Sequence, residues 1–281
     1  MIAKKLSFLA LGIALWFGSS AVIAAEGNVS DLVNRDVLRV CSDPANVPFS
    51  NNKAEGFENK IADIVAEELK IPVSYTWFPQ ATGFVRRTLF AKRCDLIIGF
   101  AQGDEFVLNT NHYYVSTYVL VYKKDSDLKG VDTLSDARLK DKRLGVIAGT
   151  PPANIFAREG LMVKAKPYSL TVDRRFFSPN ERMIADIRSG KIDGGVMWGP
   201  IGGYFAHKGG DDLAVVPLLK EGRSPRMTYR ITMGVRQSDK AWKRQLNEII
   251  KKRRHDIDAV LLEYGVPLVD EHNHVFTKPR S

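Results

Sequence analysis

The sequence predicts an α/β protein with two doubly wound α/β lobes joined by two hinge crossings. Short apolar strands alternate with amphipathic helices between residues 38 and 100, and a similar series recurs between residues 144 and 197. Extended stretches near residues 113–117 and 226–230 can carry the chain between the two series. We therefore expect residues 26–116 and 226–281 to form lobe 1 and residues 117–225 to form lobe 2, with a cleft and a possible hinge motion.

The first strand, loop and helix of lobe 1 span residues 38–70. A strand begins at residue 38, a polar loop covers residues 42–56, and residues 58–69 carry apolar side chains at helical spacing. In an open α/β sheet this loop lies at the carboxyl edge, where ligands bind, and it is longer than most such connections. Six residues of this segment are therefore cleft candidates: Asp43, Asn46, Pro48, Phe49, Ser50 and Glu58.

The rest of the chain supplies the other elements of both lobes. Strands are expected at residues 73–77, 96–100, 144–147, 194–197 and 213–218, with extended runs at 113–122, 168–177 and 228–236. Helices are expected at residues 84–89, 153–158 and 180–187, and one long helix at 241–262. The polar tail from residue 270 is expected to be frayed.

The N-terminus has the pattern of a secretory signal peptide. Lys4 and Lys5 precede an apolar run over residues 6–17, and small residues follow up to Ala25. Residues 1–25 are therefore predicted to be removed, leaving a monomer in the periplasm without a membrane anchor. This removal takes away two lysines and no acid, which lowers the formal charge from +9 to +7. Such a charge can favour an acidic partner but does not indicate nucleic acid.

Two cysteines in an exported chain usually suggest a disulfide. Cys41 ends the first strand and Cys94 precedes the strand at residues 96–100. If both strands are parallel neighbours, the offset separates the cysteines by ~13 Å along the strands, whereas a disulfide needs Cα atoms within about 7 Å. This spacing favours two unpaired, buried thiols over a disulfide, although the sequence does not decide between them.

The sequence contains little that indicates catalysis or a bound metal. It has neither a Gly-x-Ser-x-Gly elbow nor a His-Glu-x-x-His motif. Asp95 is a carboxylate near the predicted cleft, but it is expected to start a strand. His272 and His274 form a pair without a third ligand, which is a poor metal site. We expect no enzyme activity, no cofactor and no metal site.

Several motifs give the chain a resemblance to known exported proteins. The segments GFE at residue 56, CDL at 94, KID at 191 and DKAW at 239 resemble type II periplasmic solute-binding proteins of the amino-acid-binding group. The segments CSDPANVPFSN, GFENKIA, TLFAKRCDLIIG, YYVSTYV, WGPIGGYFA and YGVPL resemble the narrower MxaJ/XoxJ type. That resemblance implies a periplasmic accessory protein of a pyrroloquinoline-quinone (PQQ) methanol dehydrogenase, with the lanthanide-dependent XoxJ side favoured.

The chain departs from the amino-acid binders at two charged positions. Residues 102–106 read QGDEF and lack the arginine that those proteins use for the ligand carboxylate. The position of their ammonium-binding aspartate is matched here by Trp198. Losing both charges removes the charge-assisted contacts that hold a zwitterion, while tryptophan offers apolar area and one donor. The cleft is therefore not expected to be a high-affinity amino-acid site.

Aromatic and polar residues at the predicted strand ends complete the candidate cleft. The remaining candidates are Phe100, Gln102, Tyr113, Tyr114, Tyr118, Thr150, Pro151, Trp198 and Tyr204. Aromatic surface suits a segment of a partner protein; the expected partners are the dehydrogenase or its apo form, and its c-type cytochrome. The alternative is a solute-binding protein that delivers a small molecule such as PQQ, whose carboxylates would need cations such as Arg86, Arg174 and Arg175.

Overall fold

The computed structural model describes residues 32–222 and 224–280, and this part of the chain forms one compact unit. The predicted signal peptide lies outside the described residues. Because the contacts do not divide the described chain, the boundaries of the two lobes stay a prediction. Across the described residues, no helix has the length and apolar character needed to cross a membrane.

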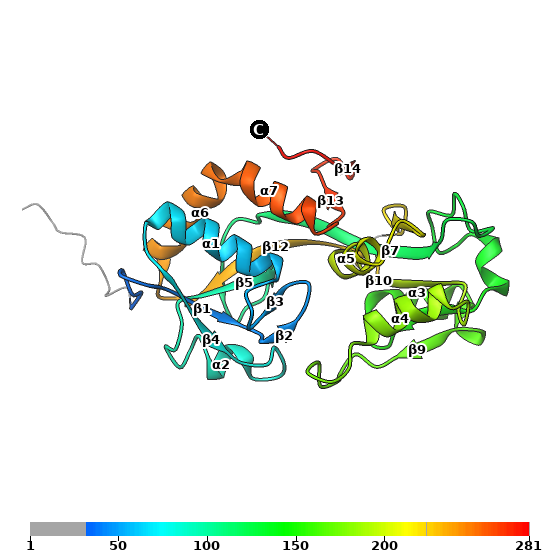
Figure 1. Ribbon diagram of the computed structural model, residues 1–281, viewed down its shortest axis with the longest axis horizontal. Helices are drawn as coiled ribbons and strands as arrows, with labels where there is room; N and C mark the ends of the chain where they lie inside the picture. Colours follow the sequence, from blue (N-terminus) through cyan, green and yellow to red (C-terminus); the bar gives the residue numbers. More distant parts are fainter. Residues whose placement is uncertain (1–31, 223, 281) are drawn as a thin grey trace, which may run out of the picture. The chain divides into compact units, whose positions relative to one another are not determined.

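A mixed sheet runs through the described chain (Figure 1). Its strand order is β4 (Val73–Trp77), β1 (Leu38–Ser42), β5 (Leu96–Ala101), β12 (Thr228–Val235), β7 (Tyr114–Lys123), β10 (Gly194–Trp198), β8 (Leu144–Ile147) and β9 (Lys166–Tyr168). In addition, β6 (Leu108–Asn109) pairs with β12, and β11 (Leu213–Pro217) pairs with β7. The β4–β1–β5 and β10–β8–β9 groups are parallel, which confirms the α/β class.

The two extended stretches expected to link the halves lie next to each other. β7 and β12 pair antiparallel, with Tyr114 opposite Ile231 and Thr117 opposite Thr228. Beyond this pairing, β7 also pairs with β10, and β12 also pairs with β5. The two strands therefore connect the two parallel groups within one sheet.

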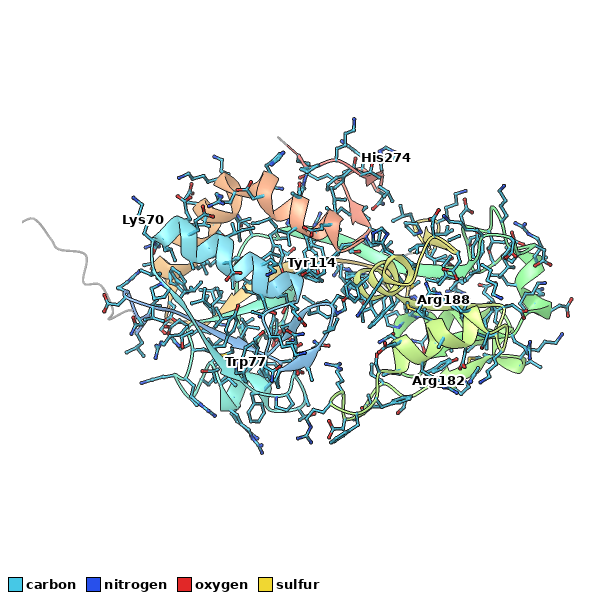
Figure 2. The ribbon with its side chains drawn as sticks, viewed as in Figure 1. Lys70, Trp77, Tyr114, Arg182, Arg188 and His274 are labelled. Carbon is cyan, nitrogen blue, oxygen red and sulfur yellow. A yellow bond between two sulfur atoms is a disulfide. The ribbon has the colours of Figure 1, made fainter. Side chains whose placement is uncertain are left out.

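The helices cover the sheet in two groups. α1 (Phe57–Leu69), α6 (Lys240–Lys252) and α7 (Arg254–Glu263) contact one another over β1, β5 and β12 (Figure 1). Their shared core includes Phe57, Leu96 and Trp242, and Tyr114 is buried in it (Figure 2). α3 (Pro151–Arg158), α4 (Pro179–Arg188) and α5 (Gly199–Lys208) pack with β7, β8 and β10 around two further apolar clusters.

Four predicted elements differ from the structure. The extended run expected at residues 168–177 ends at Tyr168, the last residue of β9, and a turn follows at residues 174–176. The long helix breaks at Arg253, whose backbone leaves the helical region and whose side chain pairs with Asp256 and Glu67. The helix expected at residues 84–89 is the short α2 (Phe84–Arg87). The prediction of a frayed tail is wrong, because β13 (Leu268–Val269) and β14 (Val275–Phe276) form a hairpin and Arg280 forms an ion pair with Asp258 at 2.7 Å.

The prediction of unpaired thiols is also wrong. Cys41 and Cys94 form a disulfide, and their Cα atoms are 5.5 Å apart. The separation of ~13 Å assumed that the strand at residues 96–100 continues in extended form back to Cys94. Cys94 instead precedes β5 outside the strand, so the estimate does not apply. Both cysteines are buried in an apolar cluster with Phe84, Leu89 and Ile97, so the bond joins β1 to the loop that follows α2.

A buried ionic network is centred on Asp95, the residue that follows Cys94 in the sequence. The Asp95 side chain is 1% exposed and accepts hydrogen bonds from Arg39 Nε and Nη2, both at 2.7 Å, and from Arg236 Nη2 at 2.6 Å. Arg236 also forms an ion pair with the buried Asp239 at 2.7 Å. Asp95 precedes β5 and Arg236 follows β12, so the network joins the ends of two neighbouring strands.

Candidate functional site

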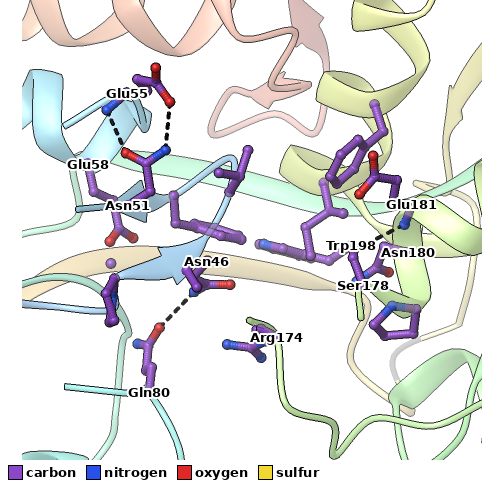
Figure 3. A pocket seen from close by; sticks show the side chains of 18 of the residues that line it. Asn46, Asn51, Glu55, Glu58, Gln80, Arg174, Ser178, Asn180, Glu181 and Trp198 are labelled. Carbon is purple, nitrogen blue, oxygen red and sulfur yellow. Dashed lines mark hydrogen bonds between the residues drawn. The ribbon is translucent and has the colours of Figure 1, made fainter. Parts of the chain in front are cut away.

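A pocket of about 680 Å³ lies where the loop after β1 faces α5 and the segment before α4 (Figure 3). Its walls come from the loop between β1 and α1, from β5, β7 and β12, from the end of β10, from α5, and from the segment that runs from residue 174 into the start of α4. The side chains that line it and matter for its chemistry are Asn46, Phe49, Asn51, Lys53, Glu55, Glu58, Gln80, Tyr114, Tyr118, Arg174, Ser178, Asn180, Glu181, Trp198, Lys208 and Tyr229.

Asp43 organises the loop that forms one wall. Its Oδ1 accepts a hydrogen bond from Ala45 N at 2.9 Å, and its Oδ2 accepts one from Gln80 N at 2.7 Å. The Gln80 side chain in turn accepts from Asn46 Nδ2 at 3.0 Å (Figure 3). Asp43 itself is buried and absent from the pocket lining. It therefore fixes the positions of its neighbours on the pocket wall.

The start of α1 is pressed against the same loop. A Cβ atom on Gly56 would lie 2.1 Å from the Phe49 carbonyl oxygen, so only glycine fits there. This approach lets Phe57 N donate to Pro48 O at 2.9 Å and Glu58 N donate to Phe49 O at 2.8 Å. These bonds satisfy helix N–H groups that would otherwise lack partners. They also fix Glu58 at the edge of the pocket.

Glu58 places a nearly buried carboxyl group at the pocket. Its side chain is 7% exposed and packs over Gly99, where a Cβ atom would lie 1.8 Å from Oε1. Gly99 has a φ of +85°, which a residue with a side chain rarely adopts. Burial raises the Glu58 pKa well above its usual value, and the nearby Asp43 charge raises it further. The geometry therefore favours a neutral carboxylic acid at this position.

Three aromatic rings form the opposite part of the pocket. Trp198 ends β10 and lies opposite Tyr118 of β7 in the sheet, with ring centroids 5.4 Å apart. Tyr229 of β12 meets Trp198 at 5.7 Å and Tyr118 at 6.5 Å, and all three pairs are close to edge-to-face. We call Tyr118, Trp198 and Tyr229 the ring cluster. Burial raises the pKa of Tyr118, so its hydroxyl stays protonated.

A glycine holds Trp198 in place. A Cβ atom on Gly199 would lie 2.4 Å from Thr117 O and 2.9 Å from Ser116 Oγ, so α5 can start against β7 only with glycine there. Pro200 follows in the first turn of α5, where its missing N–H costs nothing. The WGP sequence thus directs the indole ring to the pocket while the chain turns into a helix.

The ionisable side chains that line the pocket are of both signs. Lys53, Arg174 and Lys208 are the cations, Glu55 and Glu181 are acids, and the third acid is Glu58, whose raised pKa favours its neutral form. Arg174 Nη1 also lies 3.7 Å from Asp43 Oδ2, which brings the loop before α4 close to the loop after β1. The described lining therefore does not concentrate positive charge.

Six of the residues predicted for the cleft line this pocket. They are Asn46, Phe49, Glu58, Tyr114, Tyr118 and Trp198. Asp43, Pro48 and Ser50 belong to the loop between β1 and α1 but are buried and outside the pocket lining, with Ser50 Oγ donating to Asp43 O at 2.8 Å. Whether the six residues bind a ligand or a partner stays a prediction.

The other predicted residues are outside the pocket lining. Tyr113 is packed in the core, and Phe100 lines a second hollow beside α2. Gln102 lies in the exposed turn after β5. Thr150 and Pro151 start α3, where Thr150 Oγ1 donates to Ile147 O. Tyr204 points away on α5 and stacks on Tyr264 at 5.8 Å.

Sequence reasoning missed Tyr229 and the polar residues of the segment before α4. Tyr229 lies in the predicted extended run 228–236, but only the pairing of β12 with β7 brings it to Trp198. Ser178, Asn180 and Glu181 lie at the start of α4, and Ser178 Oγ accepts from Glu181 N at 3.2 Å as a helix cap. The sequence suggested a cap at Asn180, two residues after the actual cap, and nothing local placed this helix start at the pocket.

Comparison with known proteins identifies the family of this chain. Residues 38–264 match the family described as bacterial extracellular solute-binding proteins, family 3, and the chain belongs to that family. This confirms the type II periplasmic binding protein fold predicted from the resemblance. Among its relatives, Protein MoxJ of Methylorubrum extorquens is 30% identical over 251 residues, which cover 84% of this chain and 83% of MoxJ.

Two solved structures place the chain more narrowly. The periplasmic binding protein XoxJ of Methylobacterium extorquens AM1 is 46% identical, with a TM-score of 0.71 over 83% of this chain and 100% of that structure. MxaJ of Methlophaga aminisulfidivorans MPT is 25% identical at the same TM-score and the same two coverages. The resemblance to the MxaJ/XoxJ group is therefore confirmed, and the chain is more similar in sequence to that XoxJ than to that MxaJ.

Proposed function

We propose that this chain is a non-catalytic periplasmic binding protein that serves as an accessory or activation factor for a PQQ-dependent methanol dehydrogenase of the lanthanide type. In this proposal residues 1–25 direct export and are removed, and the pocket takes a segment of the dehydrogenase or of its apo form. The 46% identity with XoxJ supports the choice of this group.

The ring cluster is the single observation that carries the proposal. Trp198 stands where amino-acid binders of the family place an acid, as the resemblance implies, and it meets two tyrosines from the strands that connect the sheet. Tryptophan and tyrosine are frequent anchors at protein interfaces because they combine a large apolar area with a polar tip. A partner's apolar side chain could insert against these rings, and Glu58 could donate a hydrogen bond to its backbone.

A small solute is a second candidate function. A volume of about 680 Å³ lies within the range of small-molecule sites. The arginines suggested for PQQ support it poorly: Arg174 lines the pocket beside Asp43, Arg175 pairs with Asp173, and Arg86 lines the second hollow. A neutral aromatic solute suits this lining of mixed charge better than a tricarboxylate does.

Isothermal calorimetry with the apo-dehydrogenase tests the proposal. We expect saturable binding and faster recovery of dehydrogenase activity when PQQ and the metal are added with this protein present. Trp198→Asp restores an acid at this position and should weaken binding roughly tenfold or more, as loss of an interface anchor does. Tyr204→Phe is the matched control, because Tyr204 is a neighbouring aromatic residue that does not line the pocket.

The result that refutes the proposal is absence of binding together with no effect on activation. A thermal-shift assay with PQQ separates the two candidates, because a tightly bound solute must raise the melting temperature. A clear shift with PQQ that Trp198→Asp abolishes would favour the solute function.

A further inference from the structure

Two polar side chains of the pocket have no hydrogen-bond partner. Glu58 at the start of α1 and Tyr114 of β7 both line the pocket, and they are 7% and 1% exposed (Figure 3). Neither the Glu58 carboxyl nor the Tyr114 hydroxyl has a hydrogen bond or an ion pair within residues 32–222 and 224–280, the part that the structure describes. A nearly buried polar group without a partner costs free energy, so a ligand that pairs with both groups removes that cost.

The two groups belong to one place with apolar walls. They are close enough that a charge on Glu58 raises the Tyr114 pKa. The Tyr114 ring meets Phe57 edge-to-face at 6.3 Å, and Phe57 meets Phe49 of the pocket wall at 5.1 Å. Ile231 lies opposite Tyr114 in the sheet and also lines the pocket. A ligand that reaches the two polar groups therefore has apolar surface around the rest of its contact.

The surroundings of Glu58 favour the protonated acid. The titratable groups that face it are Asp43 from the loop after β1, Tyr75 from β4, and Tyr113 and Tyr114 from β7, and no cation of the described chain is among them. Burial and the Asp43 charge both raise the Glu58 pKa. The pocket therefore presents a neutral carboxylic acid beside a phenol.

A protonated carboxylic acid presents a hydrogen-bond donor and an acceptor side by side. A primary carboxamide offers the matching pair, because one of its N–H bonds lies on the same side as its C=O. A trans peptide group offers only one of the two at a time, because its N–H and C=O point in opposite directions. The Tyr114 hydroxyl then accepts from the second N–H bond of the carboxamide.

We propose that Glu58 and Tyr114 form a subsite that binds a neutral primary carboxamide carried on an apolar stem. We call these two residues the amide subsite. The carboxamide comes from a glutamine or asparagine side chain of the partner segment or from a free solute. The inference rests on the proposed function for the first of these sources only, because binding of a small amide needs no dehydrogenase.

Charged ligands fit the amide subsite less well. An anion would approach the Glu58 carboxyl with the Asp43 charge close behind it. A cation would need an ionised Glu58, which its burial opposes. Asp43 does not supply the missing charge, because its oxygens accept from Ala45 N and Gln80 N and it lies 3.7 Å from Arg174. A neutral ligand is therefore favoured over both.

Ligand-observed NMR titration of the mature protein with three compounds of nearly the same shape tests the proposal. They are benzamide, which is a neutral primary amide, benzoate, which is an anion, and benzamidine, which is a cation. We expect benzamide to bind roughly tenfold more tightly than either of the others. Its binding should weaken as pH rises through the Glu58 pKa, because ionisation removes the donor.

Variants assign the binding to the amide subsite. Glu58→Leu should weaken benzamide binding roughly tenfold, because it removes both hydrogen bonds. Glu58→Gln keeps a donor and an acceptor side by side, so its affinity should stay within about threefold of the parent while the pH dependence disappears. Tyr114→Phe should cost roughly threefold. Tyr113→Phe is the matched control, because the neighbouring tyrosine is packed in the core and does not line the pocket.

Calorimetry with the apo-dehydrogenase in excess benzamide identifies the source of the carboxamide. Weaker dehydrogenase binding assigns it to the partner segment, and unchanged binding assigns it to a free solute. Benzamide binding with the expected variant pattern but no dehydrogenase binding would support the amide subsite and refute the proposed function. Dehydrogenase binding without benzamide binding would refute the amide subsite alone.

Three further results would overturn the proposal. They are benzoate or benzamidine binding at least as tightly as benzamide, unchanged benzamide affinity in Glu58→Leu, and equal losses in Tyr113→Phe and Tyr114→Phe. Melting temperatures of all variants show whether each one is folded. Because Glu58→Gln keeps the shape of the side chain, the loss of its pH dependence tests the proposal even if Glu58→Leu does not fold.

Discussion

The buried carboxyl of Glu58 should make the stability of this protein depend on pH in a defined direction. In the unfolded chain this group titrates near its ordinary pKa of 4.5, whereas burial raises its pKa in the folded protein well above that value. The folded state therefore binds a proton that the unfolded state has released. The resulting stability is fully present below pH 4.5 and is lost as pH rises through the folded pKa.

The size of the effect follows from linkage. While the folded protein holds one proton more than the unfolded chain, the free energy of unfolding falls by ~1.4 kcal/mol for each pH unit. Glu58→Gln keeps the shape of the side chain but cannot ionise, so it removes this slope. We expect the variant to be less sensitive to pH than the parent, and to gain on it steadily as pH rises above 4.5.

Urea unfolding of parent and variant over a series of pH values measures this difference. Other titrating groups contribute equally to both proteins, so the difference between the two curves isolates the Glu58 carboxyl. Asp43→Asn provides a second comparison. The Asp43 charge is the smaller cause of the raised Glu58 pKa, so its removal should narrow the pH range over which the stability falls with pH. Parallel curves for the parent and Glu58→Gln above pH 4.5 would refute the reasoning.

Three other predictions concern the framework around the pocket. Asp95→Asn should lower the free energy of unfolding by about 3–5 kcal/mol, measured in urea, because Arg39 and the buried Arg236 both lose the carboxylate that they share, although Asp239 still contacts Arg236; a loss below about 1 kcal/mol would contradict this. The double variant Cys41→Ala, Cys94→Ala should lose ~4 kcal/mol from the 53-residue separation that the disulfide closes, and reductant should destabilise the parent but not the variant. Gly99→Ala should lower the melting temperature and flatten the pH slope of the parent, because the added methyl occupies the position of a carboxyl oxygen; an unchanged slope would count against the packing described.

Local patterns in the sequence predicted most of the elements correctly. Strands at 38–42, 73–77 and 144–147 and the helices over 57–69 and 179–188 follow from apolar periodicity, although the cap of the second helix is Ser178 and not Asn180, the cap that the sequence suggested. Elements without such periodicity were missed. The two-residue strands are too short to show a period, and the break at Arg253, where the side chain contacts Glu67 of another helix, has no signal in the apolar pattern of residues 241–262.

The candidate site was less accessible to sequence reasoning than the fold. Trp198 was found because a motif places it at a strand end, and the structure puts it in the pocket. Tyr204 has an equally suggestive position on α5, yet it turns to stack on Tyr264. Helical and strand periodicity says which face a residue occupies, but not which other element covers that face.

The sequence by itself determined the alternating α/β plan and the place of Glu58 at a helix start, because both depend on neighbours within a few residues, and the resemblance to the family pointed to Trp198 in place of an acid. Only the tertiary structure decided the burial of Glu58 over Gly99, the disulfide, the joining of Tyr118, Trp198 and Tyr229, and the hollow beside α2. Those features depend on the register between strands distant in sequence, and local propensity carries no information about that register.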